Sequence, residues 1–183
     1  MRDTTPIAVF GSSEPQPGEP LYEQARELGA QMAQAGLVVV TGGYGGVMEG
    51  ASRGARENGG PTLGVTCEAL SGRTPNRYLD RTLSTPDLFQ RQKALVEHSK
   101  GYVVLQGRAG TLSELALLWA LHRAGCLGRR PVILLGSYWK EFLQILAGNG
   151  TLERSQLDLT RLVETPREAV QALQDSIGRT GGT

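Results

Sequence analysis

The segment at residues 99–124 contains a short apolar run at residues 102–105, then a turn with two glycines, and then a helical pattern from Leu112. A strand that enters a helix through such a turn is typical of parallel α/β proteins. We expect Gly107 and Gly110 to allow positive φ angles and a close approach of the backbone to a ligand. The first N–H groups of the helix have no partner inside it, so this turn favours an anion, above all phosphate.

The same order of elements recurs from the beginning of the chain. Apolar runs at residues 7–10, 37–41 and 62–66 predict strands, and the helical spacing at residues 21–35 and 47–57 predicts two helices between them. The run at residues 37–41 is rich in valine and lacks polar alternation, which is typical of a parallel strand covered on both faces. The βαβαβ order therefore predicts an α/β fold with a doubly wound parallel sheet and right-handed crossovers.

The remaining sequence continues this alternation. A helix is expected from Thr85 to about His98, and later a strand at residues 131–135, a helix at 138–146, an edge strand at 161–164 and a last helix from Pro166. Residues 67–83 lack periodicity, which predicts a long surface loop near the site. Residues 1–178 are thus predicted to form a single domain, and residues 179–183 a frayed tail.

The charges of the chain are almost balanced, with 19 Lys and Arg against 18 Asp and Glu and a net charge of +1. No overall field draws nucleic acid or an anionic membrane, so neither is expected as a partner. Cys67 and Cys126 are far apart and lack zinc-ligand spacing, which predicts neither a metal site nor a disulfide framework and fits a reducing cytoplasm. We find no signal segment and no apolar run near the roughly 18 residues of a membrane span.

Three glycine-containing motifs occur in an order that is similar to that of a known family. Arg91, followed by Gly-Arg-Ala-Gly-Thr-Leu-Ser-Glu at residues 107–114, resembles the arginine and the PGGxGTxxE signature of the LOG family. Residues 38–50 resemble the second glycine motif of that family, and residues 7–13 resemble its first strand and turn. The LOG family comprises Rossmann-like proteins that are often labelled "possible lysine decarboxylase" and that include nucleoside 5′-monophosphate phosphoribohydrolases.

The chain departs from the family pattern in two places. Gln106-Gly107-Arg108 stands in place of Pro-Gly-Gly, and Gln92 follows Arg91 in place of a lysine. The spacing and the glycine motif at residues 42–50 resemble more closely the branch with bacterial molybdenum-cofactor carrier-like proteins. A non-catalytic protein that binds a nucleotide or the molybdenum cofactor is therefore the alternative function.

The resemblance implies hydrolysis of the N-glycosidic bond of a nucleoside 5′-monophosphate, such as AMP or a cytokinin-type nucleotide, to free base and ribose 5-phosphate. Glu114 falls on the catalytic glutamate of the family, and Arg91 falls on the arginine beside the substrate ribose. A carboxylate close to C1′ would stabilise the oxocarbenium-like charge and orient water. Neither a metal nor a cofactor is expected.

The resemblance also implies a homodimer or a higher homo-oligomer. The candidate interface is a helix face with Leu115, Leu118, Trp119 and His122. The spacing of these residues fits burial in the core of the chain equally well.

Three glycine- or serine-bearing loops are expected to meet at the carboxyl ends of the strands, where ligands bind in doubly wound sheets. With the resemblance, they predict a phosphate pocket. The candidate residues for binding phosphate and nucleotide are Gly11, Ser12, Ser13, Gly42, Gly43, Gly45, Gly46, Met48, Gly107, Arg108, Ala109, Gly110 and Thr111.

These residues also have purely structural interpretations. Thr111 and Glu114 fit a capping box, in which the glutamate only stabilises the helix start. Arg91 could lie on a solvated helix face, and the glycines could serve only close contact between helix and strand. Arg108 would either add a cation beside the phosphate or fill the pocket.

Overall fold

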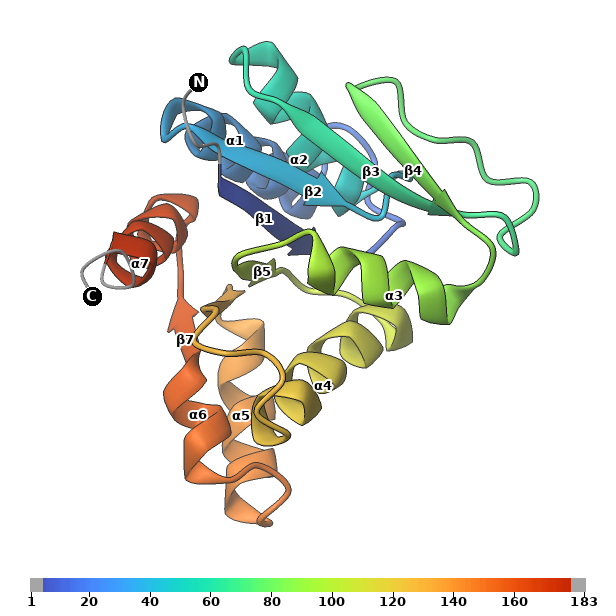
Figure 1. The fold of residues 1–183 in the computed structure, drawn as a ribbon. Coiled ribbons are helices and arrows are strands. Elements are labelled where there is room, and N and C mark those ends of the chain that lie inside the picture. Colours follow the sequence, from blue (N-terminus) through green and yellow to red (C-terminus); the bar gives the residue numbers. More distant parts are fainter. Residues whose placement is uncertain (1–4, 179–183) are drawn as a thin grey trace.

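The computed structural model describes residues 5–178. Within that part the chain forms one seven-stranded sheet and seven helices (Figure 1). In chain order the elements are β1 (Thr5–Phe10), α1 (Pro20–Gln34), β2 (Leu37–Thr41), α2 (Val47–Glu57), β3 (Thr62–Cys67), β4 (Arg81–Thr85), α3 (Leu88–Glu97), β5 (Tyr102–Val104), α4 (Ala109–Arg123), β6 (Val132–Leu135), α5 (Tyr138–Gly148), α6 (Arg154–Leu159), β7 (Thr160–Val163) and α7 (Pro166–Gly178). The tail predicted at residues 179–183 lies outside the described residues.

Neighbouring strands of the sheet are all parallel, in the order β4-β3-β2-β1-β5-β6-β7. The central strand is β1, in which Ile7 lies opposite Val39 of β2 and Val9 lies opposite Val103 of β5. From β1 the chain winds outward to β4 and then returns to the other side of β1 to form β5, β6 and β7. This order confirms the predicted α/β, Rossmann-like, doubly wound parallel sheet.

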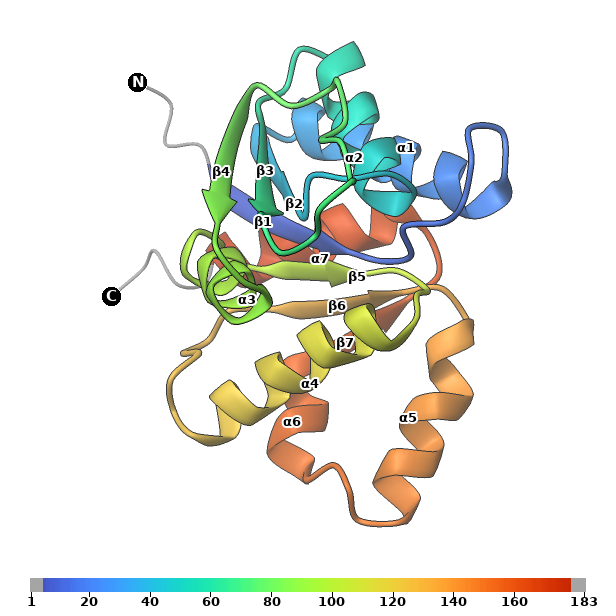
Figure 2. The ribbon, with the colours of Figure 1, turned by 90° about the vertical axis from the view of Figure 1, so that its right-hand side faces the viewer.

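Helices cover both faces of the sheet, because the central strands are apolar on both sides. In β1, Ile7 and Val9 pack with α1, α2 and α7 on one face. Ala8 and Phe10 pack with α3, α4 and α5 on the other face, and leucines of α6 join that layer. Figure 2 shows α4, α5 and α6 on the side of the sheet away from α1 and α2. The unalternated apolar runs predicted this double cover.

The direction of winding reverses between β1 and β5, and this reversal positions the functional site. β1 leads through residues 11–19 to α1 on one face, whereas β5 leads through residues 105–108 to α4 on the other face. The two loops leave adjacent strand ends in opposite directions, which creates a crevice between them. The loops that follow β1, β2 and β5 therefore meet, as predicted.

Most predicted elements are confirmed, and β2 and α2 have the predicted bounds. The sheet edge at β7 is also confirmed. The start of α7 is capped, since Glu168 N donates to Thr165 Oγ1 at 3.3 Å and Thr165 N donates to Glu168 Oε2 at 3.2 Å. The short helix α6 was not predicted.

The prediction was wrong at residues 81–85, which were assigned to a loop and to a helix start but form the edge strand β4. The side chains of β4 are mostly exposed, so the apolar signal of a strand is missing. The strand is held instead by parallel pairing with β3. The Asp80 carboxylate also accepts a hydrogen bond from Thr62 N at 2.8 Å. The helix start also moves, because Asp87 rather than Thr85 caps α3 through Gln90 N at 2.8 Å.

The helix face predicted as a subunit interface is largely part of this chain's own core. Leu115 and Leu118 are fully buried and Trp119 is 6% exposed, and all three pack in the apolar layer beneath α4. His122 is half-buried. Three of the four predicted interface residues are therefore unavailable to a second subunit.

Candidate functional site

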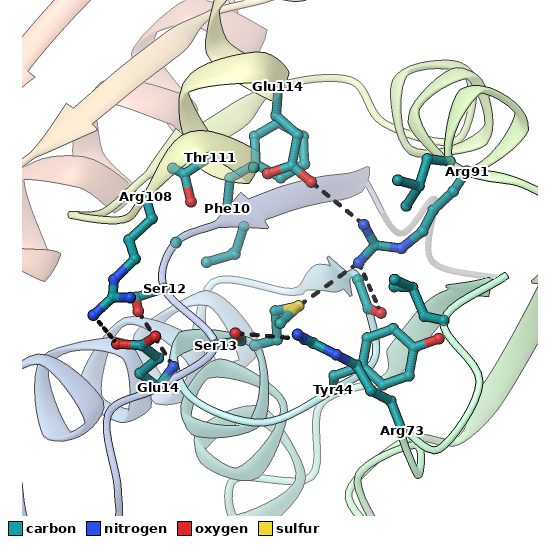
Figure 3. A pocket seen from close by; sticks show the side chains of 17 residues that line it. Phe10, Ser12, Ser13, Glu14, Tyr44, Arg73, Arg91, Arg108, Thr111 and Glu114 are labelled. Carbon is teal, nitrogen blue, oxygen red and sulfur yellow. Dashed lines mark hydrogen bonds and ion pairs between the residues drawn. The ribbon is translucent and has the colours of Figure 1, made fainter.

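A cleft of about 250 Å³ lies at the crevice beside the carboxyl ends of β1 and β2 (Figure 3). This volume is slightly below the ~300–1,000 Å³ that is typical of small-molecule sites, so the cleft suits one small ligand. The residues that line it are Val9, Phe10, Gly11, Ser12, Ser13, Glu14, Gly42, Tyr44, Met48, Leu70, Arg73, Leu88, Arg91, Arg108, Gly110, Thr111 and Glu114.

Glu114 lies in the second turn of α4 and directs its carboxyl group into the cleft (Figure 3). Because α4 begins after the N-cap residue Arg108, Thr111 is already the third residue of the helix. Glu114 is thus too far along α4 to bond back to the cap, and the capping-box interpretation is wrong. Its side chain is only 13% exposed. Burial raises the pKa of this carboxyl to about 7, against the opposing effect of the Arg91 guanidinium. Such a group can take up or release a proton near neutral pH.

Arg91 is buried, and it does not lie on a solvated helix face. Its Nε donates to Val65 O at 2.9 Å and its Nη2 donates to Gly42 O at 3.0 Å. The guanidinium carbon also lies 5.7 Å from the centre of the Tyr44 ring. Its Nη1 is 3.7 Å from Glu114 Oε1, which is long for a direct hydrogen bond. The backbone thus fixes Arg91, and its remaining donor faces the Glu114 carboxyl group.

The absence of a side chain at Gly42 makes room for this guanidinium. A Cβ atom at residue 42 would collide with Arg91 Nη2 and would lie 2.7 Å from Met48 Sδ. The Met48 sulfur lies 3.8 Å from Arg91 Nη2 and forms part of the wall of the cleft. The second glycine motif therefore contributes to the site through the packing of Arg91.

The turn before α4 differs in its backbone from the prediction, since neither Gly107 nor Gly110 has a positive φ among the described residues. Gly107 is instead required by close packing, because a Cβ atom there would collide with Thr111 Oγ1 and lie 3.0 Å from Ser12 N. The helix starts at Ala109, so the amides of residues 109–111 have no acceptor within α4. The Arg108 side chain forms no capping hydrogen bond in the described structure. This helix end is therefore suited to an anion.

The cleft gathers most of the residues predicted from the sequence. Those that line it are Gly11, Ser12, Ser13, Gly42, Met48, Arg91, Arg108, Gly110, Thr111 and Glu114. The predicted residues in the same loops that do not line it are Gly43, Gly45, Gly46, Gly107 and Ala109. Gly46 is the N-cap of α2, with a φ of 68° that favours glycine.

Several residues of the cleft were missed by sequence analysis, above all Glu14, Tyr44, Leu70 and Arg73. Leu70 and Arg73 belong to the loop predicted at residues 67–83, which borders the site as expected. Asn76 ties this loop to the loop after β2, since its N donates to Gly43 O at 2.9 Å and its Nδ2 donates to Tyr44 O at 3.0 Å. The only feature of the sequence that pointed to this loop as part of the site was its group of polar and charged residues at 73–78.

Among the described residues, no three His, Cys, Asp or Glu side chains are grouped so that they could hold a metal ion. Within residues 5–178, the structure also contains no helix with the length and apolar character needed to cross a membrane.

Comparison with known proteins identifies a family and several similar proteins. The model of the SLOG cluster4 family matches residues 4–166. A relative from Mycobacterium marinum, named cytokinin riboside 5′-monophosphate phosphoribohydrolase, is 29% identical over 174 residues, which is 91% of each chain.

Two similar solved structures have names that refer to the molybdenum cofactor. The molybdenum cofactor binding protein of Rippkaea orientalis has a TM-score of 0.74 and 27% identity, over 97% of this chain and 99% of that one. The molybdenum cofactor carrier protein of Chlamydomonas reinhardtii has a TM-score of 0.74 and 26% identity, over 96% and 99%. These relatives share the fold of this chain, but their names indicate two different functions: phosphoribohydrolase activity and binding of the molybdenum cofactor.

Proposed function

The chain belongs to the SLOG cluster4 family, and from this membership and the geometry of its cleft we propose that it hydrolyses the N-glycosidic bond of a nucleoside 5′-monophosphate. The products are the free base and ribose 5-phosphate. AMP and cytokinin-type nucleotides are the first substrates to test, because the mycobacterial relative is named for a cytokinin nucleotide.

The observation that carries this proposal is the buried Glu114 carboxyl group, with a pKa of about 7, in the same cleft as the amino-terminal end of α4. A nucleotide phosphate bound at residues 109–111 would direct the rest of the ligand into the cleft, towards Glu114. The site thus offers separate places for the phosphate and for the reacting sugar carbon.

In the proposed reaction the bond between C1′ and the base nitrogen breaks, and its electron pair leaves with the base. The ribose then carries oxocarbenium-like positive charge, which the Glu114 carboxylate stabilises from nearby. Water attacks C1′ and Glu114 accepts one of its protons, while the departing base takes up a proton, so the net products are the neutral base and ribose 5-phosphate. Arg91 keeps the carboxylate oriented, because its own position is fixed by the carbonyls of Val65 and Gly42.

The experiment is to incubate the purified protein with AMP and other nucleoside monophosphates and to measure free base by chromatography, beside Glu114→Gln. We expect base release that falls about 100-fold or more in Glu114→Gln. The wild-type kcat/KM should rise with pH through about 7, since the active form of Glu114 is the carboxylate. Release at the wild-type rate by Glu114→Gln would contradict the assigned role.

The similarity to two molybdenum-cofactor proteins favours a second candidate, a non-catalytic binder or carrier of a nucleotide or of the molybdenum cofactor. Gln106 and Arg108, which replace the expected Pro and Gly around Gly107, also favour it. The absence of base release from every monophosphate, with binding still measurable by calorimetry, would decide for this candidate.

We also propose that the protein is a homodimer, and we assign the interface to an area between α3 and α4 that we call the α3–α4 face. It is formed by Phe89, Leu117 and Leu121, beside an ion pair between Lys93 and Glu97. Phe89 is 84% exposed, which is unusual for so large an apolar side chain. The face carries both signs of charge, so two copies can pair about a two-fold axis.

A further inference from the structure

Three charged side chains border the cleft and have no role in the proposed reaction: Glu14, Arg73 and Arg108. They are exposed, and they come from the loop after β1, the loop after β3 and the N-cap of α4. Figure 3 shows the guanidinium groups of Arg73 and Arg108 on two sides of Ser12 and Ser13. Two cations thus flank the Ser12–Ser13 loop, which lines the same cleft as the start of α4, where the phosphate is proposed to bind.

Arg108 is occupied by a carboxylate of the chain itself. Its Nη2 lies 2.6 Å from Glu14 Oε2, in an ion pair whose side chains are 78% and 54% exposed. The backbone N of Glu14 donates to Ser12 Oγ at 3.2 Å, which keeps the glutamate next to the serine loop. An anionic group is therefore already in contact with the arginine beside the helix end that suits an anion.

Arg73 is held on the other side of the loop by an aromatic ring. Its guanidinium carbon lies 5.9 Å from the centre of the Tyr44 ring, and its Nη1 donates to Ser13 Oγ at 3.5 Å. The bonds of Asn76 to the loop after β2 hold this part of the chain in place. No carboxylate among the described residues forms an ion pair with Arg73, so its charge is available to an external anion.

We propose that Glu14 holds the place of the ligand's phosphate, and that a dianionic phosphomonoester displaces it from Arg108 and is then bound between Arg108 and Arg73. Water screens an exposed ion pair, so releasing Glu14 costs little. A phosphate offers more charge and more acceptor oxygens than a carboxylate, so it binds Arg108 more strongly and displaces Glu14. Only the identity of the ligand as a nucleotide rests on the proposed function.

This exchange makes Arg73, Arg108 and Glu14 determinants of specificity. The two arginines favour a phosphorylated ligand over the same ligand without phosphate. Glu14 opposes weakly charged ligands, because they do not displace it. The protein is thus expected to discriminate against nucleosides at the phosphate end of the cleft, independently of Glu114.

The test is calorimetric titration of wild type, Glu14→Gln, Arg108→Gln, Arg73→Gln and the double variant Glu14→Gln/Arg108→Gln with AMP, adenosine and inorganic phosphate. Glu14→Gln should tighten AMP binding by about three- to tenfold and leave adenosine binding unchanged. Each arginine variant should weaken AMP binding by at least about as much. The double variant should bind AMP like Arg108→Gln, because Glu14 acts only through Arg108. Glu141→Gln, an exposed glutamate on α5, is the control for net charge and should bind AMP like wild type.

The exchange is overturned if Glu14→Gln binds AMP like wild type, or if its gain persists in the Arg108→Gln background. It is also overturned if inorganic phosphate and AMP both fail to bind wild type. If the variants show the expected order of affinities for inorganic phosphate but AMP does not bind, the exchange is supported and the proposed nucleotide substrate is contradicted. The expected ranking for AMP without base release would support the exchange and contradict only the hydrolysis.

Discussion

At the scale of single residues, the position of Glu114 in the cleft reduces the stability of the folded protein when its carboxyl group is ionised. Its carboxyl group is buried, and its one nearby cation is 3.7 Å away. Burial therefore outweighs attraction, and its pKa in the folded protein is about 7, compared with an ordinary value of 4.5. The folded state binds this proton more tightly than the unfolded state does, so deprotonation of Glu114 destabilises the fold.

We therefore expect Glu114→Gln to be more stable than wild type at high pH. The stabilising effect of the proton is fully present below pH 4.5 and is lost as pH rises through about 7. The difference between the two pKa values corresponds to at most about 3 kcal/mol in the free energy of unfolding at pH 8. Urea unfolding at pH 4 and pH 8 measures this effect, with the exposed Glu141→Gln on α5 as the control. A gain in stability that is equal at both pH values would contradict the assignment.

At the scale of elements, the site depends on where helices begin, and this is what the sequence predicted least well. The glycine motifs and the order of strands identified the loops, because glycine and apolar runs leave local signals. The start of α4 was placed at Leu112 rather than Ala109, since Arg108, Ala109 and Gly110 resemble a loop in composition. With the helix start at Leu112, Glu114 would cap the helix. With the start at Ala109, it lies in the second turn and reaches the cleft.

The residues that sequence analysis missed come from segments without periodicity. Arg73 and Leu70 lie on a loop whose path is set by contacts of Asn76 with the chain some thirty residues earlier, and a local pattern cannot reveal such contacts. The edge strand β4 was missed for a related reason, since its main-chain pairing with β3 requires few apolar side chains. The central strands were predicted because both of their faces are buried.

The junction of β2, α2 and α3 permits a specific prediction for Gly42→Ala. The new methyl group would displace the Arg91 guanidinium, and Glu114 would lose the group that orients it. We expect base release to fall by on the order of 10- to 100-fold. The protein should also lose stability, because a displaced Arg91 gives up its hydrogen bonds to the carbonyls of Val65 and Gly42. Gly148→Ala is the matched control, since a Cβ atom there meets nothing within 4 Å. Equal rates for Gly42→Ala and wild type would show that the position of Arg91 is unimportant.

At the scale of the whole molecule, the sheet separates two layers of helices that differ in how completely their apolar surface is buried. The layer of α1, α2 and α7 buries one face, and α1 and α2 are closely packed through small residues. The layer of α3 to α6 buries the other face, but α4 is apolar over more of its surface than the core covers. Leu117 and Leu121 remain only partly buried beside the exposed Phe89 of α3. The α3–α4 face is thus an apolar surface that a second copy could cover.

The proposed homodimer rests on this excess of apolar surface. We expect light scattering to give a mass near twice the 19.6 kDa of the chain. Phe89→Glu should give a monomer, because a two-fold interface buries the residue twice and each fully buried Phe contributes about 2–3 kcal/mol. Ile145→Glu is the control, since Ile145 is 57% exposed on α5, away from the α3–α4 face, and it should leave the dimer intact. A dimer that survives Phe89→Glu but dissociates in Ile145→Glu would move the interface to α5. A monomeric wild type would contradict the dimer itself and would leave Phe89 exposed for another reason.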